Sequence, residues 1–127
     1  MTDATAANTA LGKRFFDLIE AGDLDAVAAC YADDAVIWHN TDGIAQGKAE
    51  NLETLKRFTA AFAGIAYTER RLAAWPGGFS HQHLLKAKKR DGAEVELAAA
   101  IVCEVKGGKI TRLDEYFDSA KLAAWFN

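Results

Sequence analysis

From Gly64 to Asp118 the sequence largely alternates apolar and polar residues with a period of two, which is the pattern of β-strands. Asp91-Gly92 lies in one of the breaks and is a strong signal for a tight hairpin. Strands that follow one another this closely pair with their neighbours, so this half of the chain is restricted to one antiparallel sheet. The four predicted strands are at residues 65–75, 79–90, 93–106 and 109–118.

Before Gly64 the apolar residues repeat at helical spacing, beginning with Leu11 and Phe15. Gly22 is suited to end the first helix and Asp23 to cap a second one. Helices that come first and strands that come later indicate an α+β fold, with the helices packed against one curved sheet and a cavity between them. The other predicted elements are a strand at 36–40, a loop at 41–47, a third helix at about 48–63, and a short closing helix with Leu122, Trp125 and Phe126.

The composition is that of a folded protein with a single domain. Of the 127 residues, 50% are hydrophobic and 26% are charged. We expect a flexible N-terminus at 1–10 and one domain at 11–127. The net charge of -3 does not indicate a nucleic-acid partner, and no apolar run is long enough for a membrane. The polar start lacks the pattern of a secretion signal, so a cytoplasmic location is expected.

Ionisable residues on apolar strand faces are the first candidates for a site. His81 and His83 share a face with Phe79 and Leu85, and Glu115 shares one with Leu113 and Phe117. Such groups more often line a pocket than fill a core, and Glu115 is a candidate partner for one of the imidazoles. The alternatives are core histidines bonded to backbone carbonyls and a sheet-edge ion pair for Glu115. Two histidines and a carboxylate also fit a metal site in principle, although no metal is expected.

A second candidate group lies at the end of the first predicted strand. His39 is a possible base, and Asn40 is a possible ligand for a water or a polar substrate group. Strand alternation places Trp38 and Asn40 inward and His39 outward, unless the strand bulges. A surface strand end is the alternative for this group.

Two further strand faces are distinctive. Tyr67, Arg71 and Trp75 share a face of the first long strand and are candidates for the rim of the cavity. The outer face of residues 93–106 has a small apolar centre flanked by charge, which suits self-association as a homodimer. The centre of that face is formed by Ala98, Ala100 and Val102.

Five short segments carry a resemblance to a known family: 21–25 (Ala-Gly-Asp-Leu-Asp), 31–35 (Tyr-Ala-Asp-Asp-Ala), Gly47-Lys48, 108–111 (Gly-Lys-Ile-Thr) and 115–118 (Glu-Tyr-Phe-Asp). Through them the chain resembles the nuclear transport factor 2-like superfamily, in particular its SnoaL-like, ketosteroid isomerase-like and limonene epoxide hydrolase-like branches. The resemblance implies a cystatin-like cone, with three N-terminal helices packed on a strongly curved, mostly antiparallel sheet around an internal pocket. This scaffold hosts isomerases, cyclases, hydrolases and non-catalytic domains.

The resemblance also implies roles for single residues. The tyrosine and aspartic acid of the isomerase oxyanion hole correspond to Phe15 and Ile101, and neither side chain donates a hydrogen bond. Steroid isomerisation is therefore not expected. The general base of that branch corresponds to His39. The active-site groups of the epoxide hydrolase branch correspond to Trp38, Asn40, His81, His83 and Glu115.

The expected function is that of a cofactor-independent isomerase, cyclase or hydrolase that acts by proton transfer on a small, mostly apolar molecule. The alternative is a non-catalytic ligand-binding or dimerisation module on the same fold. The candidate catalytic residues are His39, His81, His83 and Glu115. The candidate substrate-binding residues are Phe15, Trp38, Asn40, Phe79, Leu85, Leu113 and Phe117.

Overall fold

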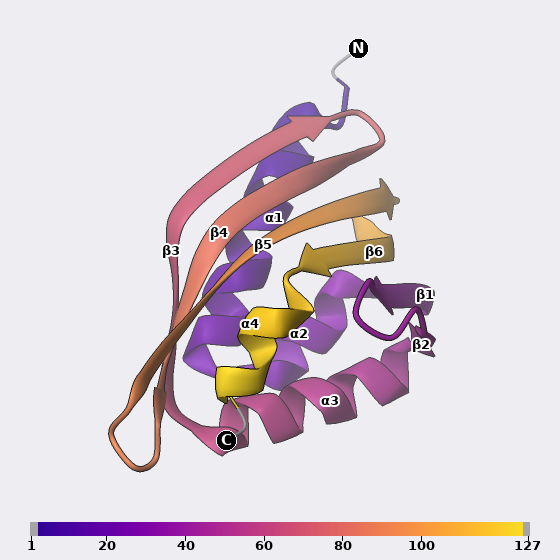
Figure 1. Ribbon diagram of the computed structural model, residues 1–127. Helices are drawn as coiled ribbons and strands as arrows, with labels where there is room; N and C mark the ends of the chain where they lie inside the picture. The colour runs from indigo at the N-terminus through magenta and orange to yellow at the C-terminus, as the bar shows by residue number, and fades with distance from the viewer. Residues whose placement is uncertain (1–2, 126–127) are drawn as a thin grey trace.

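The computed structural model of the protein describes residues 3–125. Its helices lie on the concave side of one curved sheet, as the sequence predicts (Figure 1). The helices are α1 (Thr5–Ala21), α2 (Leu24–Cys30), α3 (Lys48–Ala61) and α4 (Ser119–Leu122), followed by the 3-10 helix η1 (Ala123–Trp125). The strands are β1 (Tyr31–His39), β2 (Ala45–Gly47), β3 (Phe62–Trp75), β4 (Gly78–Lys89), β5 (Glu94–Lys106) and β6 (Lys109–Phe117).

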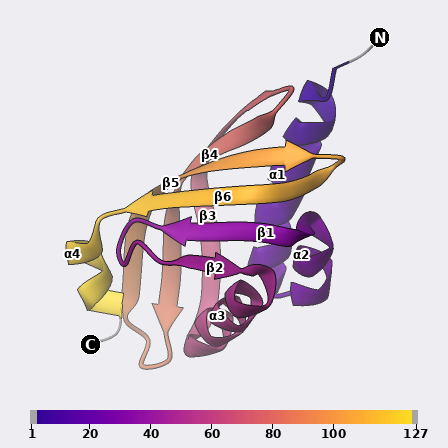
Figure 2. The same cartoon turned by 90° about the vertical axis from the view of Figure 1, so that its right-hand side faces the viewer.

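The sheet has the strand order β2-β1-β6-β5-β4-β3. Strands β3 to β6 pair as the predicted antiparallel meander. Strand β1 extends the sheet by running parallel to β6, and the short β2 pairs antiparallel with β1 at the edge (Figure 2). The α+β class and the mostly antiparallel, unclosed sheet are therefore confirmed.

Several element boundaries differ from those predicted. Strand β1 begins at Tyr31 instead of residue 36, and β2 lies inside the stretch expected to be a loop. Helix α1 begins at Thr5, so residues 5–10, which were expected to belong to a flexible N-terminus, are helical. The physical reason is Asn8, which is 2% exposed and donates from Nδ2 to the backbone oxygens of Trp75 and Pro76.

The two helix signals at residues 22 and 23 act as predicted. Gly22 has a φ of 72° in the left-handed region, and its N–H donates to the Ile19 carbonyl. The side chain of Asp23 accepts a hydrogen bond from the N–H of Ala26 and caps α2. Together they turn the chain from α1 into α2 within two residues.

The core has two parts. The larger packs α1 and α2 against the concave face of the sheet, with Phe15, Phe16 and Phe79 almost completely buried. The smaller lies below the C-terminal helices, where the Trp125 ring packs edge-on against Phe62. Phe126, also expected in the closing helix, lies outside the described residues, as do Met1 and Thr2. None of the helices within residues 3–125 is long and apolar enough to cross a membrane.

Candidate functional site

A cavity of about 260 Å³ lies between the helices and the concave face of the sheet. Helices α1 and α3, strands β1 to β6 and the C-terminal segment all contribute to its wall. Its volume is slightly below the range of about 300–1,000 Å³ that is typical of pockets for drug-sized ligands, so it suits a small molecule. Seven aromatic side chains of the described residues line it: Phe15, Phe16, Tyr31, Phe58, Tyr67, Phe117 and Trp125.

The wall of the cavity contains an imidazole–carboxylate pair. His39 at the end of β1 lies beside Glu115 of β6, because the two strands run parallel in the register that pairs these residues. The His39 Nε2 is 3.0 Å from the Glu115 Oε1, and each side chain is about one-fifth exposed. The hydrogen bond to Glu115 raises the pKa of His39, with help from the charges of Glu115 and Asp42 and against the effect of burial.

The structure corrects the expected orientation of this strand end. His39 and Ile37 point into the cavity, whereas Trp38 packs on the outer face with its ring 5.4 Å from that of Tyr116. Asn40 is exposed; its side chain donates to the Phe117 carbonyl and accepts from the Phe117 N–H. Trp38 and Asn40 therefore do not line the cavity, and Asn40 fastens β1 to β6.

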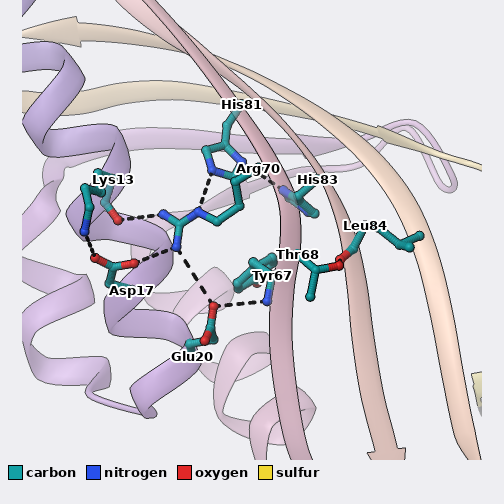
Figure 3. A network of polar contacts seen from close by, with 9 residues as sticks. All are labelled: Lys13, Asp17, Glu20, Tyr67, Thr68, Arg70, His81, His83 and Leu84. Carbon is teal, nitrogen blue, oxygen red and sulfur yellow. Dashed lines mark hydrogen bonds and ion pairs between the residues drawn. The ribbon is translucent and has the colours of Figure 1, made fainter.

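His81 and His83 face inward, as predicted, but belong to a different network (Figure 3). A bulge in β3 at Glu69, which has a φ of 52°, turns Arg70 toward α1 and β4. The Arg70 guanidinium then bonds to Asp17 at 2.6 Å and to the Lys13 carbonyl at 2.9 Å. Because the bulge resets the alternation of β3, Arg71 and Trp75 are exposed and only Tyr67 of that predicted face lines the cavity.

The arginine determines the tautomers of both histidines. Arg70 donates from Nε to His81 Nε2 at 3.2 Å, so the proton of a neutral His81 is on Nδ1. The His81 Nδ1 is 2.9 Å from His83 Nδ1, which must then accept, leaving the His83 proton on Nε2. That buried Nε2 has no hydrogen-bond partner among residues 3–125.

Burial keeps both imidazoles neutral. It lowers the pKa of His81 to about 4, with a further contribution from the Arg70 charge. It lowers the pKa of His83 to about 3, with contributions from His81 and Arg70. Neither residue lines the cavity, so the geometry does not offer either of them to a ligand there.

The expected link between these histidines and Glu115 is absent from the described part of the chain. His81 and Glu115 do share the concave face, but Ile101 of β5 lies between them in the register. Glu115 pairs with His39 instead. Of the predicted apolar wall, Phe15, Leu85, Leu113 and Phe117 line the cavity, whereas Phe79 is core.

Sequence reasoning missed a set of polar residues in the wall near α3. Tyr31 donates from its hydroxyl to Asn51 Oδ1 at 2.8 Å, and Asn51, Gln46 and Thr54 continue the chain of hydrogen bonds. Asn51 has no motif around it in the sequence. The available signal was an amide that helical spacing places beside the half-buried Leu52 and Leu55.

No three His, Cys, Asp or Glu side chains of residues 3–125 gather closely enough to hold a metal ion. Cys30 and Cys103 are both buried and unpaired. Burial raises the pKa of the Cys103 thiol, so this residue is not a nucleophile at neutral pH.

The family model of the SnoaL-like domain matches residues 13–113, and the chain belongs to this family. No curated protein matches the sequence significantly. The fold and the family model thus agree that the protein is a SnoaL-like domain.

Solved structures show the same fold at low identity. A protein named as a polyketide cyclase from Xanthomonas campestris pv. campestris is 20% identical, with 95% of each chain covered and a TM-score of 0.83. A limonene epoxide hydrolase-like epoxide hydrolase from M. tuberculosis is 21% identical, with 94% of this chain and 89% of that chain covered and a TM-score of 0.78. A nuclear transport factor 2-like protein from Burkholderia xenovorans LB400 is 20% identical, with 99% and 100% covered and a TM-score of 0.80. At these identities the likeness establishes the fold alone.

Proposed function

We propose that the protein is a cofactor-independent acid–base enzyme of the isomerase, cyclase or hydrolase type that acts on a small, mostly apolar molecule. The observation that carries this proposal is the His39–Glu115 pair in the wall of an otherwise largely apolar cavity. A titratable group with a shifted pKa in a cleft is the usual sign of proton-transfer chemistry. The structural neighbours named as a polyketide cyclase and an epoxide hydrolase support the same class.

The roles follow from the geometry of the pair. Glu115 accepts from the Nε2–H of His39, which leaves Nδ1 as the nitrogen that takes a proton from a substrate carbon or water and later returns it. The negative charge of Glu115 stabilises the imidazolium that forms in between. Tyr67 also lines the cavity, and burial raises the pKa of its hydroxyl, so it remains a protonated donor for a developing oxyanion.

Screening carbonyl, enol and epoxide substrates tests the proposal. His39→Gln is expected to lower kcat by about 10²–10⁴-fold, because a positioned acid or base contributes that much. Glu115→Gln is expected to lower kcat and to move the acidic limb of the pH profile downward, since the pKa of His39 loses its main support. His83→Gln and the exposed outer-face change Glu96→Gln are the matched controls and should keep the activity. Ligand binding without turnover in every substrate class would instead indicate a non-catalytic binding module.

We further propose a homodimer that forms through the outer face of the sheet. Val102 is 42% exposed and Tyr116 is 46% exposed, and they lie on neighbouring strands beside Ala98 and Ala100. Apolar side chains grouped on a flat sheet face suit self-association. Sedimentation of the protein at micromolar concentration tests this, and a monomer would contradict it.

A further inference from the structure

We infer that the cavity has a second polar subsite, formed by Tyr31, Gln46 and Asn51, which binds a hydroxyl or carbonyl group of an uncharged ligand. The subsite runs from Tyr31 at the start of β1 through Asn51 of α3 to Gln46 of β2, which pairs with Ile37 of β1. It deepens the proposed function by defining the substrate as a neutral molecule with two polar ends, and it rests on that function only for the role of His39.

The hydrogen bonds of the subsite run in one direction. The Tyr31 hydroxyl donates to Asn51 Oδ1 at 2.8 Å, and Asn51 Nδ2 donates to Gln46 Oε1 at 3.3 Å. Gln46 Nε2 donates to Thr54 Oγ1 at 3.0 Å, and Thr54 donates to the Glu50 carbonyl at 3.1 Å. This order sets the orientation of both amides, so their donors and acceptors are positioned before a ligand arrives.

The subsite has hydrogen-bonding groups left over that a ligand can use. An amide nitrogen has two N–H groups, and among residues 3–125 those of Asn51 and Gln46 each make one hydrogen bond. The Tyr31 oxygen donates to Asn51 and keeps lone pairs to accept with. Asn51 is only 3% exposed, so bulk water does not readily satisfy its second N–H. A ligand hydroxyl both donates and accepts, and a ligand carbonyl accepts from one or both amides.

The charges around the cavity exclude an anionic ligand. Among the described residues its lining contains two carboxylates, Asp42 and Glu115, and no lysine or arginine. Burial is the main cause of the raised pKa of both Tyr31 and Tyr67, and the Glu115 charge adds to it at both hydroxyls. A carboxylate placed there is repelled and has only His39 to pair with. The Glu115 carboxylate is already held by His39 Nε2 at 3.0 Å, which leaves less of it to pair with an ammonium group.

Binding of four probes with one apolar body tests the subsite by isothermal titration calorimetry. The probes are naphthol, a dihydroxynaphthalene with its hydroxyls on opposite rings, naphthoate and naphthylmethylammonium. We expect the dihydroxy probe to bind about three- to tenfold more tightly than naphthol, which is the effect of one net hydrogen bond. Naphthoate should bind at least about tenfold more weakly than naphthol.

Two variants remove the amides while keeping the side-chain shape. Gln46→Met and Asn51→Leu should bring the ratio of the two phenol affinities to about one. Gln82→Met makes the same chemical change on the exposed outer face and should leave the ratio unchanged. Asn51 is buried, so thermal melting checks that the Asn51→Leu variant is folded. If that variant is unfolded, the Gln46→Met variant still decides the test, because Gln46 is only half-buried.

An equal affinity of the parent protein for both phenols would overturn the inference, and so would an unchanged ratio in Gln46→Met. Tightest binding of naphthoate or of the ammonium probe, or no binding of any probe, would also overturn it. The readout is affinity and not turnover, so its failure is separate from that of the proposed function. If the dihydroxy probe binds more tightly than naphthol but no substrate is turned over, only the proposed enzymatic function is contradicted. If a substrate is turned over but the two phenols bind equally, only the subsite is contradicted.

Discussion

Replacing both buried histidines with glutamine is expected to remove much of the acid sensitivity of folding. His81 and His83 are 1% and 4% exposed, and the pKa of each falls from 6.5 to about 4 and about 3 in the native protein. In the unfolded chain both titrate near 6.5, so below that pH the unfolded state binds protons that the native state does not. The free energy of unfolding therefore falls as the pH drops below about 6.5.

The size of the effect follows from the two pKa values. On acidification from about pH 7.5 to pH 5, the pH ends about 1.5 units below the unfolded pKa of each histidine. Each of these units lowers the free energy of unfolding by about 1.4 kcal/mol for each histidine. The loss is therefore ~2 kcal/mol for each residue and ~4 kcal/mol for the pair. Because a domain is stabilised by only about 5–15 kcal/mol, this loss is a large share of the total. Glutamine does not titrate, so the double variant lacks this term.

Urea unfolding of the parent protein and of His81→Gln/His83→Gln, followed by circular dichroism across this pH range, measures the difference. The double variant is expected to lose ~4 kcal/mol less than the parent on acidification. His39→Gln is the control with the opposite sign. The pKa of His39 is raised by Glu115, so its stabilisation is present below about 6.5 and is lost as the pH rises through the native value.

The chain has three histidines, so these variants account for every imidazole. Equal acid-induced losses in the parent and the double variant would refute the assignment of neutral, buried imidazoles to the Arg70 network.

Three further changes probe the fold and the assembly. Gly78→Ala is expected to cost at least about 2 kcal/mol in urea unfolding, because a Cβ would overlap the backbone oxygen of Cys103 on β5; a neutral result would contradict this contact. Asn40→Ala should cost about 1–3 kcal/mol, because it removes two hydrogen bonds to the Phe117 backbone. With kcat measured in parallel, a loss of activity without a loss of stability would mean that Asn40 acts on substrate after all. Val102→Lys should dissociate the proposed dimer without unfolding the monomer, and sedimentation of both proteins would show no difference if the outer face is not the interface.

The local pattern of the chain determined the residues of β4, β5 and β6 and the face that each of them occupies. On β4 the period of two predicted an inner face with Phe79, His81 and His83, and all three are buried. The glycine and aspartate signals placed the turn between α1 and α2 for the same reason: they depend on backbone conformations that a few neighbouring residues decide. Interactions of this kind are short in sequence and can be predicted from it.

Tertiary structure alone decided which of these residues meet. His39 reaches Glu115 only because β1 runs parallel to β6 in one particular register, which no local pattern specifies. Arg70 reaches His81 only because a bulge in β3 shifts the alternation by one residue, and that shift also removes Arg71 from the inner face. The sequence by itself therefore determined the faces of β4 to β6 and the turn between α1 and α2. Pairing across the sheet determined the acid–base pair and the cavity, because side chains far apart in the chain become neighbours only after the strands have adopted their register.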